Sequence, residues 1–231
     1  WMWRNFEIFK NNNLLDAILH EEFFGNRTPL LYILHIYFNP FISDIDNYRL
    51  SVFIISLIAP YIFYICLVQN FKNTNKIILF FISSLILLSP FFRTSAYWGL
   101  EINYAIITFL ITFFLINLTF NAENKKDSSL YILIALLTFV SSLTIYFDQK
   151  FLIVPILVLF KIINSRINLK FKIFSIFNFF IYSIPFLYLI YIWNGIVPPA
   201  TQSDNPNTIT NLSRVNLLWF EHLGYATTMI A

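Results

Sequence analysis

Six long apolar runs dominate this 231-residue chain and limit what it can fold into. They cover residues 51–70, 77–92, 104–120, 129–147, 151–163 and 173–193, and a seventh begins near residue 215. A helix needs about 20 apolar residues to cross the hydrocarbon core of a bilayer. Only 12% of the residues are charged, against about 25% in an average soluble domain. The sequence therefore predicts an all-α integral membrane protein, a multi-span bundle whose backbone polar groups are satisfied within helices.

The runs differ in how well they fit a single crossing. Four of them reach the usual length, namely 51–70, 104–120, 129–147 and 173–193. Run 77–92 is slightly short and has Pro90 near its end, and run 151–163 is clearly short, against a usual range of about 17 to 25 residues. We expect run 151–163 to form either a short span or a re-entrant segment.

Basic residues are concentrated in alternate loops between the runs. Loops 71–76, 121–128 and 161–172 carry eight Lys or Arg residues, whereas loops 93–103, 148–150 and 194–214 carry three. Short loops rich in Lys and Arg remain in the cytoplasm. The count predicts that the first set is cytoplasmic and that the second set faces outward. Abundant Phe, Ile, Asn and Lys are typical of AT-rich microbial coding, so we expect a multi-pass protein of a bacterial inner membrane.

Residues 1–50 form a separate extracytoplasmic region in this prediction, ahead of the membrane region 51–231. Two short amphipathic pieces, WMWRNFEIF and LLDAILHEEFF, carry aromatic residues suited to a membrane interface. An apolar stretch between Pro29 and Pro40 is too short to span. The region therefore predicts interfacial helices packed on the membrane. Because the chain starts at Trp1 and stops inside an apolar stretch, we expect a fragment lacking the first span and the C-terminal part.

The order of these parts resembles the GT-C superfamily of membrane glycosyltransferases. The stretch RTPLLYIL (27–34) is similar to that family's Pro-containing segment, often written His-Pro-Pro-Leu-Tyr, with Arg27 in place of the His. The outer turn FRTSAYWGLEINY (92–104) resembles a turn of that family that carries an Arg and an acid. The turn FDQKF (147–151) resembles another, which often carries a Lys or an Arg-Gln pair. DQK (148–150) and YIWNGIVPP (191–199) are also similar to the dolichyl-phosphate-glucose α-1,2-glucosyltransferases.

The resemblance implies transfer of a sugar from a polyprenyl-phosphate carrier to a lipid-linked or cell-surface glycan, at a site facing away from the cytoplasm. Its partners would be that donor, that acceptor and membrane lipids. The resemblance places the family's principal acid just upstream of Trp1, outside this sequence. Such a reaction needs a carboxylate base for the acceptor hydroxyl and a cation or metal for the leaving phosphate.

Seven residues on the predicted outer side, six at the outer turns and Arg27 in the region 1–50, are candidates for these roles. Glu101 and Asp148 are the candidate catalytic acids, Arg27, Arg93 and Lys150 the candidate ligands of the donor phosphate, and Gln149 and Trp98 further site candidates. Each also has an ordinary interpretation. Glu101 can pair with Arg93, Asp148 and Lys150 can form a self-neutralising pair at the ends of two helices, and Trp98 fits an interfacial aromatic belt. In the functional interpretation Asp148 positions Lys150 or contacts acceptor hydroxyls.

Other residue patterns predict little chemistry. The three histidines, His20, His35 and His222, are too scattered for a metal site. The acid pairs Glu21–Glu22 and Asp44–Asp46 are typical of solvated loops, although a divalent ion stays possible and the cofactor is unassigned. A formal charge of +3 gives no argument for nucleic acid, and Cys66 lies within an apolar run.

Two other classes of function remain open. Transporters and flippases carry charges at mid-span, whereas runs 51–70, 77–92, 104–120 and 129–147 contain none. A polysaccharide polymerase or ligase would also face outward. The clustering of charge at the outer turns favours chemistry at the membrane surface, and therefore the transferase.

Overall fold

The computed structural model describes residues 2–25, 27–120, 127–195 and 197–204, and every regular element among them is a helix. The first part comprises α1 (Met2–Asn11), α2 (Leu14–Ile18), α3 (Leu30–Phe38), α4 (Ile45–Ser56), α5 (Ile58–Asn70), α6 (Lys76–Ser84), the 3-10 helix η1 (Leu85–Leu88) and α7 (Pro90–Trp98). The second comprises α8 (Ile102–Phe120), α9 (Asp127–Phe147), the 3-10 helix η2 (Gln149–Leu152), α10 (Ile153–Ile163), α11 (Leu169–Trp193) and α12 (Pro199–Asp204).

Four helices in this part of the chain are long and apolar enough to cross a membrane. They are Ile45–Asn70, in which α4 and α5 run on with a single residue between them, Ile102–Phe120, Asp127–Phe147 and Leu169–Trp193. The expected fold class, an all-α membrane protein, is confirmed at this level. The predicted seventh run, from about residue 215, lies outside the described residues.

The run 77–92, predicted as a slightly short span, is broken near its end. The helix Lys76–Leu88 is followed by α7, and the two are bent by 63° at this break. Proline at position 90 disfavours helical backbone at Ser89, which is extended (φ −61°, ψ 119°) and accepts the N–H of Phe92 at 3.4 Å. Pro90 is therefore the first residue of a new helix, where its missing N–H costs nothing.

The helix that contains the first predicted span begins at Ile45, six residues before the apolar run 51–70. Its first turn, IDNY, is polar and is therefore easily mistaken for loop. Asp44 caps it, because its Oδ1 accepts the N–H groups of Asp46 at 3.0 Å and Asn47 at 2.9 Å. The short run 151–163 forms α10, which is 11 residues long.

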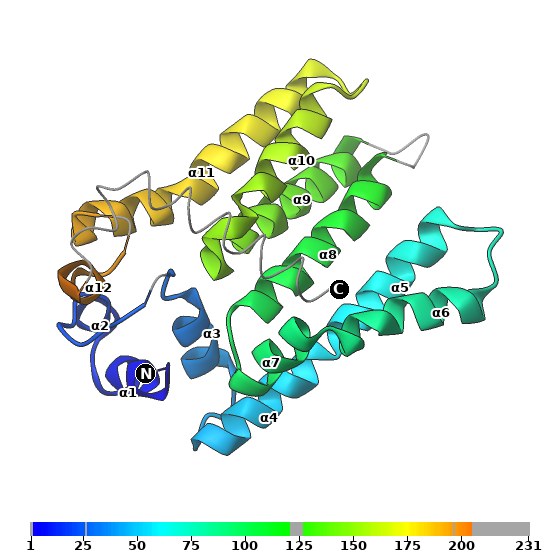
Figure 1. Ribbon diagram of the computed structural model, residues 1–231. Helices are drawn as coiled ribbons and strands as arrows, with labels where there is room; N and C mark the ends of the chain where they lie inside the picture. Colours follow the sequence, from blue (N-terminus) through cyan, green and yellow to red (C-terminus); the bar gives the residue numbers. More distant parts are fainter. Residues whose placement is uncertain (1, 26, 121–126, 196, 205–231) are drawn as a thin grey trace.

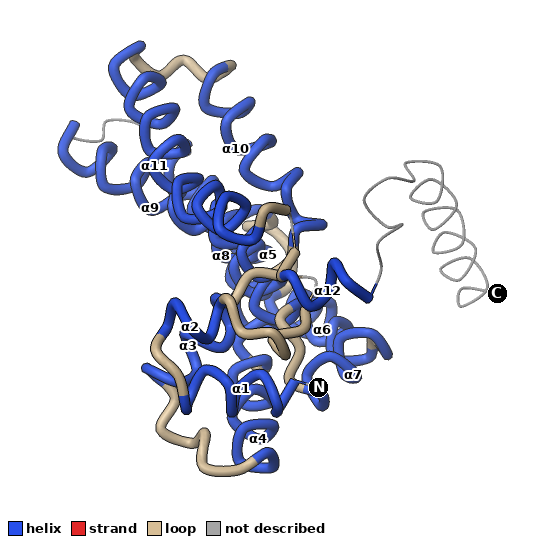
Figure 2. Tube along the Cα trace, turned by 90° about the vertical axis from the view of Figure 1, so that its left-hand side faces the viewer, coloured by secondary structure: helices blue, strands red, loops and turns tan. Residues whose placement is uncertain are grey.

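The connections between helices gather at the two ends of the bundle. Figure 1 shows the α5–α6 and α10–α11 connections at one end, with the last turn of α8 and the first turn of α9, and α1, α3 and α7 toward the other. Lys72, Lys76, Lys161, Arg166, Lys170 and Lys172 belong to the first end. Figure 2 separates α9, α10 and α11, which run side by side, from the group α1–α4. Which end is cytoplasmic stays a prediction.

A buried aromatic cluster fills the second end and joins α1, α3 and α4 to the membrane helices. It includes Phe6, Tyr32, Tyr48, Tyr104 and Phe147. The Phe6 ring lies 4.9 Å from that of Tyr32 and 4.7 Å from that of Tyr48, while Tyr104 stacks on Phe147 at 5.3 Å. Because Phe147 is the last residue of α9, this cluster fixes the backbone that leads into Asp148.

Candidate functional site

Three charged side chains from distant parts of the sequence meet at the aromatic end of the bundle. Nη1 of Arg27 donates to Oε2 of Glu101 at 2.8 Å, and Nη2 donates to Oδ2 of Asp148 at 3.2 Å. The side chains of Glu101 and Asp148 are 3% and 4% exposed, whereas that of Arg27 is 27% exposed. Both carboxylates are thus buried behind a guanidinium that reaches the surface.

Arg27, Glu101 and Asp148 form a triad of charged side chains. Hydrogen bonds hold together the backbone segments that carry Arg27 and Asp148. The hydroxyl of Thr28, next to Arg27, donates to the carbonyl of Tyr146, two residues before Asp148. Tyr146 also donates its hydroxyl to the carbonyl of Tyr182 at 2.5 Å and accepts the N–H of Phe186 at 3.2 Å. These bonds bridge the helix where Pro185 interrupts α11. The start of α3, the end of α9 and the middle of α11 are therefore linked at the site.

The two acids occupy the ends of helices. Glu101 immediately precedes α8, and its carbonyl accepts the N–H of Ala105 at 3.1 Å. Asp148 follows α9 and caps η2, since its Oδ1 accepts the N–H of Lys150 at 3.0 Å. Asp148 therefore uses both oxygens, one for Lys150 and one for Arg27. Arg27 contacts Glu101 through Oε2.

The charge balance of the triad is unequal, with two carboxyl groups sharing one guanidinium. Burial raises the pKa of the Glu101 carboxyl, which the nearby Asp148 also raises, while Arg27 acts in the opposite direction. A proton is therefore held on Glu101 more readily than on an ordinary glutamate. A buried carboxyl group with a raised pKa is the type of group that enzymes use for acid–base chemistry.

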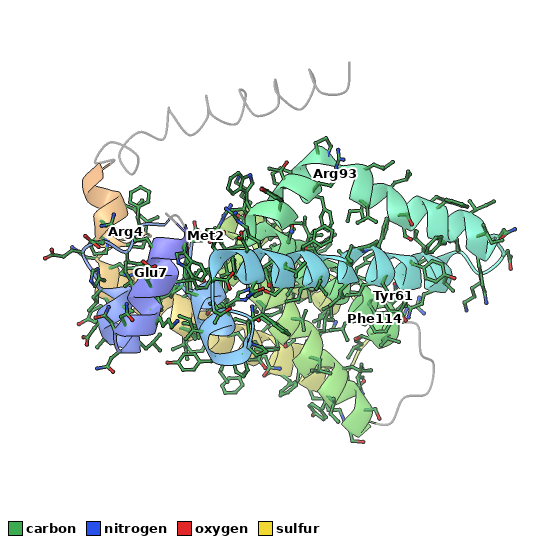
Figure 3. The ribbon with its side chains drawn as sticks, turned by 90° about the horizontal axis from the view of Figure 1, so that it is seen from below. Met2, Arg4, Glu7, Tyr61, Arg93 and Phe114 are labelled. Carbon is green, nitrogen blue, oxygen red and sulfur yellow. The ribbon has the colours of Figure 1, made fainter. Side chains whose placement is uncertain are left out.

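The local ion pairs considered in the sequence are not the ones formed. Glu101 pairs with Arg27 and not with Arg93, which lies exposed on α7. Figure 3 shows Arg93 at an edge of the molecule, with its side chain pointing away from the neighbouring helices. Asp148 contacts the backbone N–H of Lys150, whose side chain is exposed. The ion pairs with nearby residues do not form because Arg27, which is distant in the sequence, contacts both acids.

The two remaining site candidates differ in environment. Trp98 is 50% exposed, and its ring lies 5.0 Å below the guanidinium carbon of Arg49. Gln149 lies beside Asp148, and its Nε2 is buried with no hydrogen-bond partner among the described residues. An unpaired buried donor costs about 1–3 kcal/mol unless something else accepts from it.

Sequence reasoning missed two residues that the fold singles out. His35 is fully buried on α3, with Nε2 2.7 Å from the hydroxyl of Tyr104 and Nδ1 2.8 Å from the amide of Asn39. Arg49 packs over the rings of Tyr97 and Trp98. The only signal for His35 was its place within an apolar stretch, and for Arg49 its place as the last charge before a span.

No cluster of three or more His, Cys, Asp or Glu side chains that could hold a metal ion occurs in the described ranges. The acid pairs noted in the sequence are used otherwise. Glu22 pairs with Arg4 at 2.5 Å on the surface, and Asp44 caps α4. His222 lies outside the described residues.

Comparison of the chain with protein-family models, with curated proteins and with solved structures finds no match. Any function proposed for it therefore rests on the residues of the site and on the architecture around them.

Proposed function

We propose that this protein is a multi-pass glycosyltransferase of the GT-C type in a bacterial inner membrane, with its active site outside the cytoplasm. It transfers a sugar from a polyprenyl-phosphate carrier to a lipid-linked or cell-surface glycan. One observation carries the proposal: two buried carboxylates, Glu101 and Asp148, are gathered on Arg27 at one end of a bundle of apolar helices. A site at the end of the spans lets a lipid-borne donor and a polar acceptor meet.

Glu101 is the stronger candidate for the general base. Its raised pKa favours uptake of a proton from an acceptor hydroxyl, whereas both oxygens of Asp148 already accept hydrogen bonds. Asp148 is then a positioning residue that holds Arg27 from the other side. Arg27 is a positioning residue as well, because two carboxylates already compensate its charge. This differs from the phosphate-binding role that the sequence suggested for it.

The cations left for the donor phosphate are Arg93 and Lys150. Both are exposed, and neither forms an ion pair with a described acidic residue. Arg and Lys stabilise the negative charge that grows on a leaving phosphate. The unpaired amide of Gln149 could donate to a sugar hydroxyl next to Asp148. Trp98 offers an exposed ring at the same end of the bundle.

The proposed step balances without a further reactant. The acceptor hydroxyl loses its proton to the Glu101 carboxylate while its oxygen bonds to the anomeric carbon of the sugar. The bond between that carbon and the phosphate oxygen breaks, and its electron pair leaves with the polyprenyl phosphate. The extra negative charge on the phosphate is offset by Lys150 and Arg93. The proton on Glu101 then passes to water.

The test is turnover by purified protein supplied with polyprenyl-phosphate sugars and a membrane lipid extract. Release of polyprenyl phosphate is followed in wild type, Glu101→Gln and Lys150→Met. We expect Glu101→Gln to lower the rate by about 10²–10⁴-fold, the usual contribution of a general base. Matched controls are Glu7→Gln and Lys10→Met, which remove exposed charges on α1 and should leave the rate unchanged.

Two results would count against the transferase. Wild-type protein that turns over no donor would refute it, and full activity in Glu101→Gln would remove Glu101 from the reaction. The bend of 63° between Lys76–Leu88 and Pro90–Trp98 supports a second candidate, since transporters often contain broken helices. Movement of a lipid-linked sugar across protein-containing liposomes, without release of polyprenyl phosphate, would favour that candidate.

A further inference from the structure

A cavity of about 240 Å³ lies where the start of α1, the first turns of α4 and the end of α7 come together. Its walls include Trp3, Tyr48, Arg49, Trp98 and Leu100. Figure 3 shows Met2, which also lines the cavity, at the point where α1 meets α4. None of the three charged residues of the triad lines it. The cavity is thus distinct from the triad, although it shares Trp98 with the candidate site described above.

Arg49 is the cationic group of this cavity, and aromatic rings hold it in place. Its guanidinium carbon lies 5.0 Å from the ring centroid of Trp98 and 5.6 Å from that of Tyr97. A guanidinium that lies over aromatic faces can still donate hydrogen bonds from its N–H groups to a ligand. Its side chain is 26% exposed, so most of its stem is already ordered by packing.

The charge of Arg49 is only weakly compensated. Among the described residues its ion-pair partner is Asp46, at 3.8 Å, and that side chain is 88% exposed. An exposed pair at this distance is weak because water screens it. Asp44, on the preceding turn, is occupied by the N–H groups that it caps. Arg49 therefore differs from Arg27, whose two partners are buried.

The position of the cavity selects the class of ligand. Arg49 belongs to the first turns of the helix Ile45–Asn70, one of the four long and apolar enough to cross a membrane. If that helix crosses a bilayer, Arg49 is near the headgroups at one end. Arginine matches the geometry of phosphate oxygens, and the rings of Trp3, Tyr48 and Trp98 provide apolar walls for the ester group attached to a phosphate.

From these observations we infer that the Arg49 cavity binds the phosphate ester of an anionic lipid headgroup, or a free phosphate of the same chemistry. The phosphate oxygens accept hydrogen bonds from the guanidinium edge, replacing the weak contact with Asp46. The attached glycerol lies against the aromatic walls. This inference does not depend on the transferase proposal, because it rests on Arg49 and concerns a binding event without turnover, even though Trp98 serves both proposals.

The experiment is calorimetric titration of the purified protein in neutral detergent. The probes are dihexanoylphosphatidylglycerol, dihexanoylphosphatidylcholine and inorganic phosphate. We expect saturable binding of the phosphatidylglycerol, and weaker binding of the phosphatidylcholine, because its choline cation opposes Arg49. Inorganic phosphate that binds as tightly as the phosphatidylglycerol would assign the site to free phosphate. Failure of wild type to bind either anion would overturn the inference.

Four variants sharpen the test. Arg49→Gln should weaken binding by at least about tenfold, as expected for losing a charge-assisted hydrogen bond. Arg49→Lys should weaken it less, and Asp46→Asn should tighten it by removing the competing carboxylate. Arg4→Gln, which removes a surface arginine outside the cavity, should change nothing. Unchanged affinity in both Arg49→Gln and Asp46→Asn would refute the site, even if one variant were poorly folded.

Discussion

Arg27 donates a hydrogen bond of 2.8 Å to Glu101, 74 residues further along the chain, and the same guanidinium reaches Asp148, 121 residues away. Both contacts join loops or helix ends that carry no sequence pattern in common. The two carboxylates of the triad are buried, whereas its guanidinium is partly exposed at the protein surface. Removing Arg27 leaves two buried carboxylates without a cation, whereas removing one acid leaves a single ion pair.

Replacing Arg27 by glutamine should destabilise the protein by about 3 kcal/mol, the low end for breaking a buried ion pair, because Arg27 is itself 27% exposed. The cause is two buried carboxylates left without a cation. Thermal unfolding in detergent measures this. Adding Glu101→Gln to Arg27→Gln should restore part of the loss, since one of the stranded charges is removed.

The matched control for that series is Arg4→Gln, whose ion pair with Glu22 is exposed on both sides and should contribute little. Equal stability of Arg27→Gln and Arg4→Gln would mean that the triad does not hold the folded state together.

The pH dependence of turnover should report Glu101. Burial raises its pKa above the usual 4.5, and a base works only when ionised, so activity should be lost as the pH falls through a value above 4.5. Asp148→Asn removes a neighbouring negative charge that contributes to this raised pKa. The acid limb of kcat/KM against pH should therefore move to lower pH in that variant. An acid limb that moves to higher pH, or does not move, would mean that the charge of Asp148 does not raise the pKa of Glu101.

His35 should make the protein sensitive to acid. Burial lowers its pKa from 6.5 to about 4. Between these values the unfolded chain binds a proton that the folded chain does not, so stability is complete above pH 6.5 and falls as the pH drops toward 4. The loss is at most about 3 kcal/mol, because one pKa unit corresponds to about 1.4 kcal/mol. Unfolding temperatures at pH 7.5 and 5.0 measure it.

In His35→Gln that extra acid sensitivity should disappear, because glutamine has no proton to gain and still offers hydrogen-bonding groups to Tyr104. An identical drop in unfolding temperature for wild type and His35→Gln would assign the acid sensitivity to other groups.

Gly99→Ala should destabilise the protein by about 2–4 kcal/mol through backbone strain and overpacking together. Gly99 has φ +69°, and an added Cβ would lie 2.6 Å from Cε1 of Tyr48. Tyr48 is buried and donates its hydroxyl to the Gly99 carbonyl at 2.6 Å, so the ring has little room to move. Gly25→Ala is the control, because nothing lies within 4 Å of its added Cβ, and it should be neutral in the same unfolding assay.

The predicted orientation can be tested with a single introduced cysteine, because Cys66 is the one cysteine of these 231 residues and is buried. In a Cys66→Ser background, Thr94→Cys on α7 should react with a membrane-impermeant maleimide added to intact cells. Thr74→Cys, in the α5–α6 connection, should react only after the membrane is opened. The opposite labelling pattern would invert the topology and remove the outward-facing site from the proposal.

Several features followed from residues close together in the chain. The sequence predicted six spans and the start of a seventh, and the four runs of full length correspond to the four helices that are long and apolar enough to cross a membrane. The break near Pro90 was signalled, but the sequence did not show whether the helix would end there or merely kink. The start of the first crossing was missed, since a polar first turn capped by Asp44 resembles a loop until its hydrogen bonds are known.

The amino-acid sequence by itself determined that this protein is helical and suited to lipid, and that its charges gather between the apolar runs. Only the tertiary structure decided which charges meet. Arg93 and Lys150 are close in sequence to Glu101 and Asp148, yet both acids pair with Arg27. Packing of the Phe6, Tyr32 and Tyr104 cluster brings the start of α3 against the ends of α8 and α9. Packing places Arg27 against both buried acids, whereas Arg93 and Lys150 remain exposed to solvent. Interactions between charges are stronger where solvent is excluded, so the acids pair with Arg27.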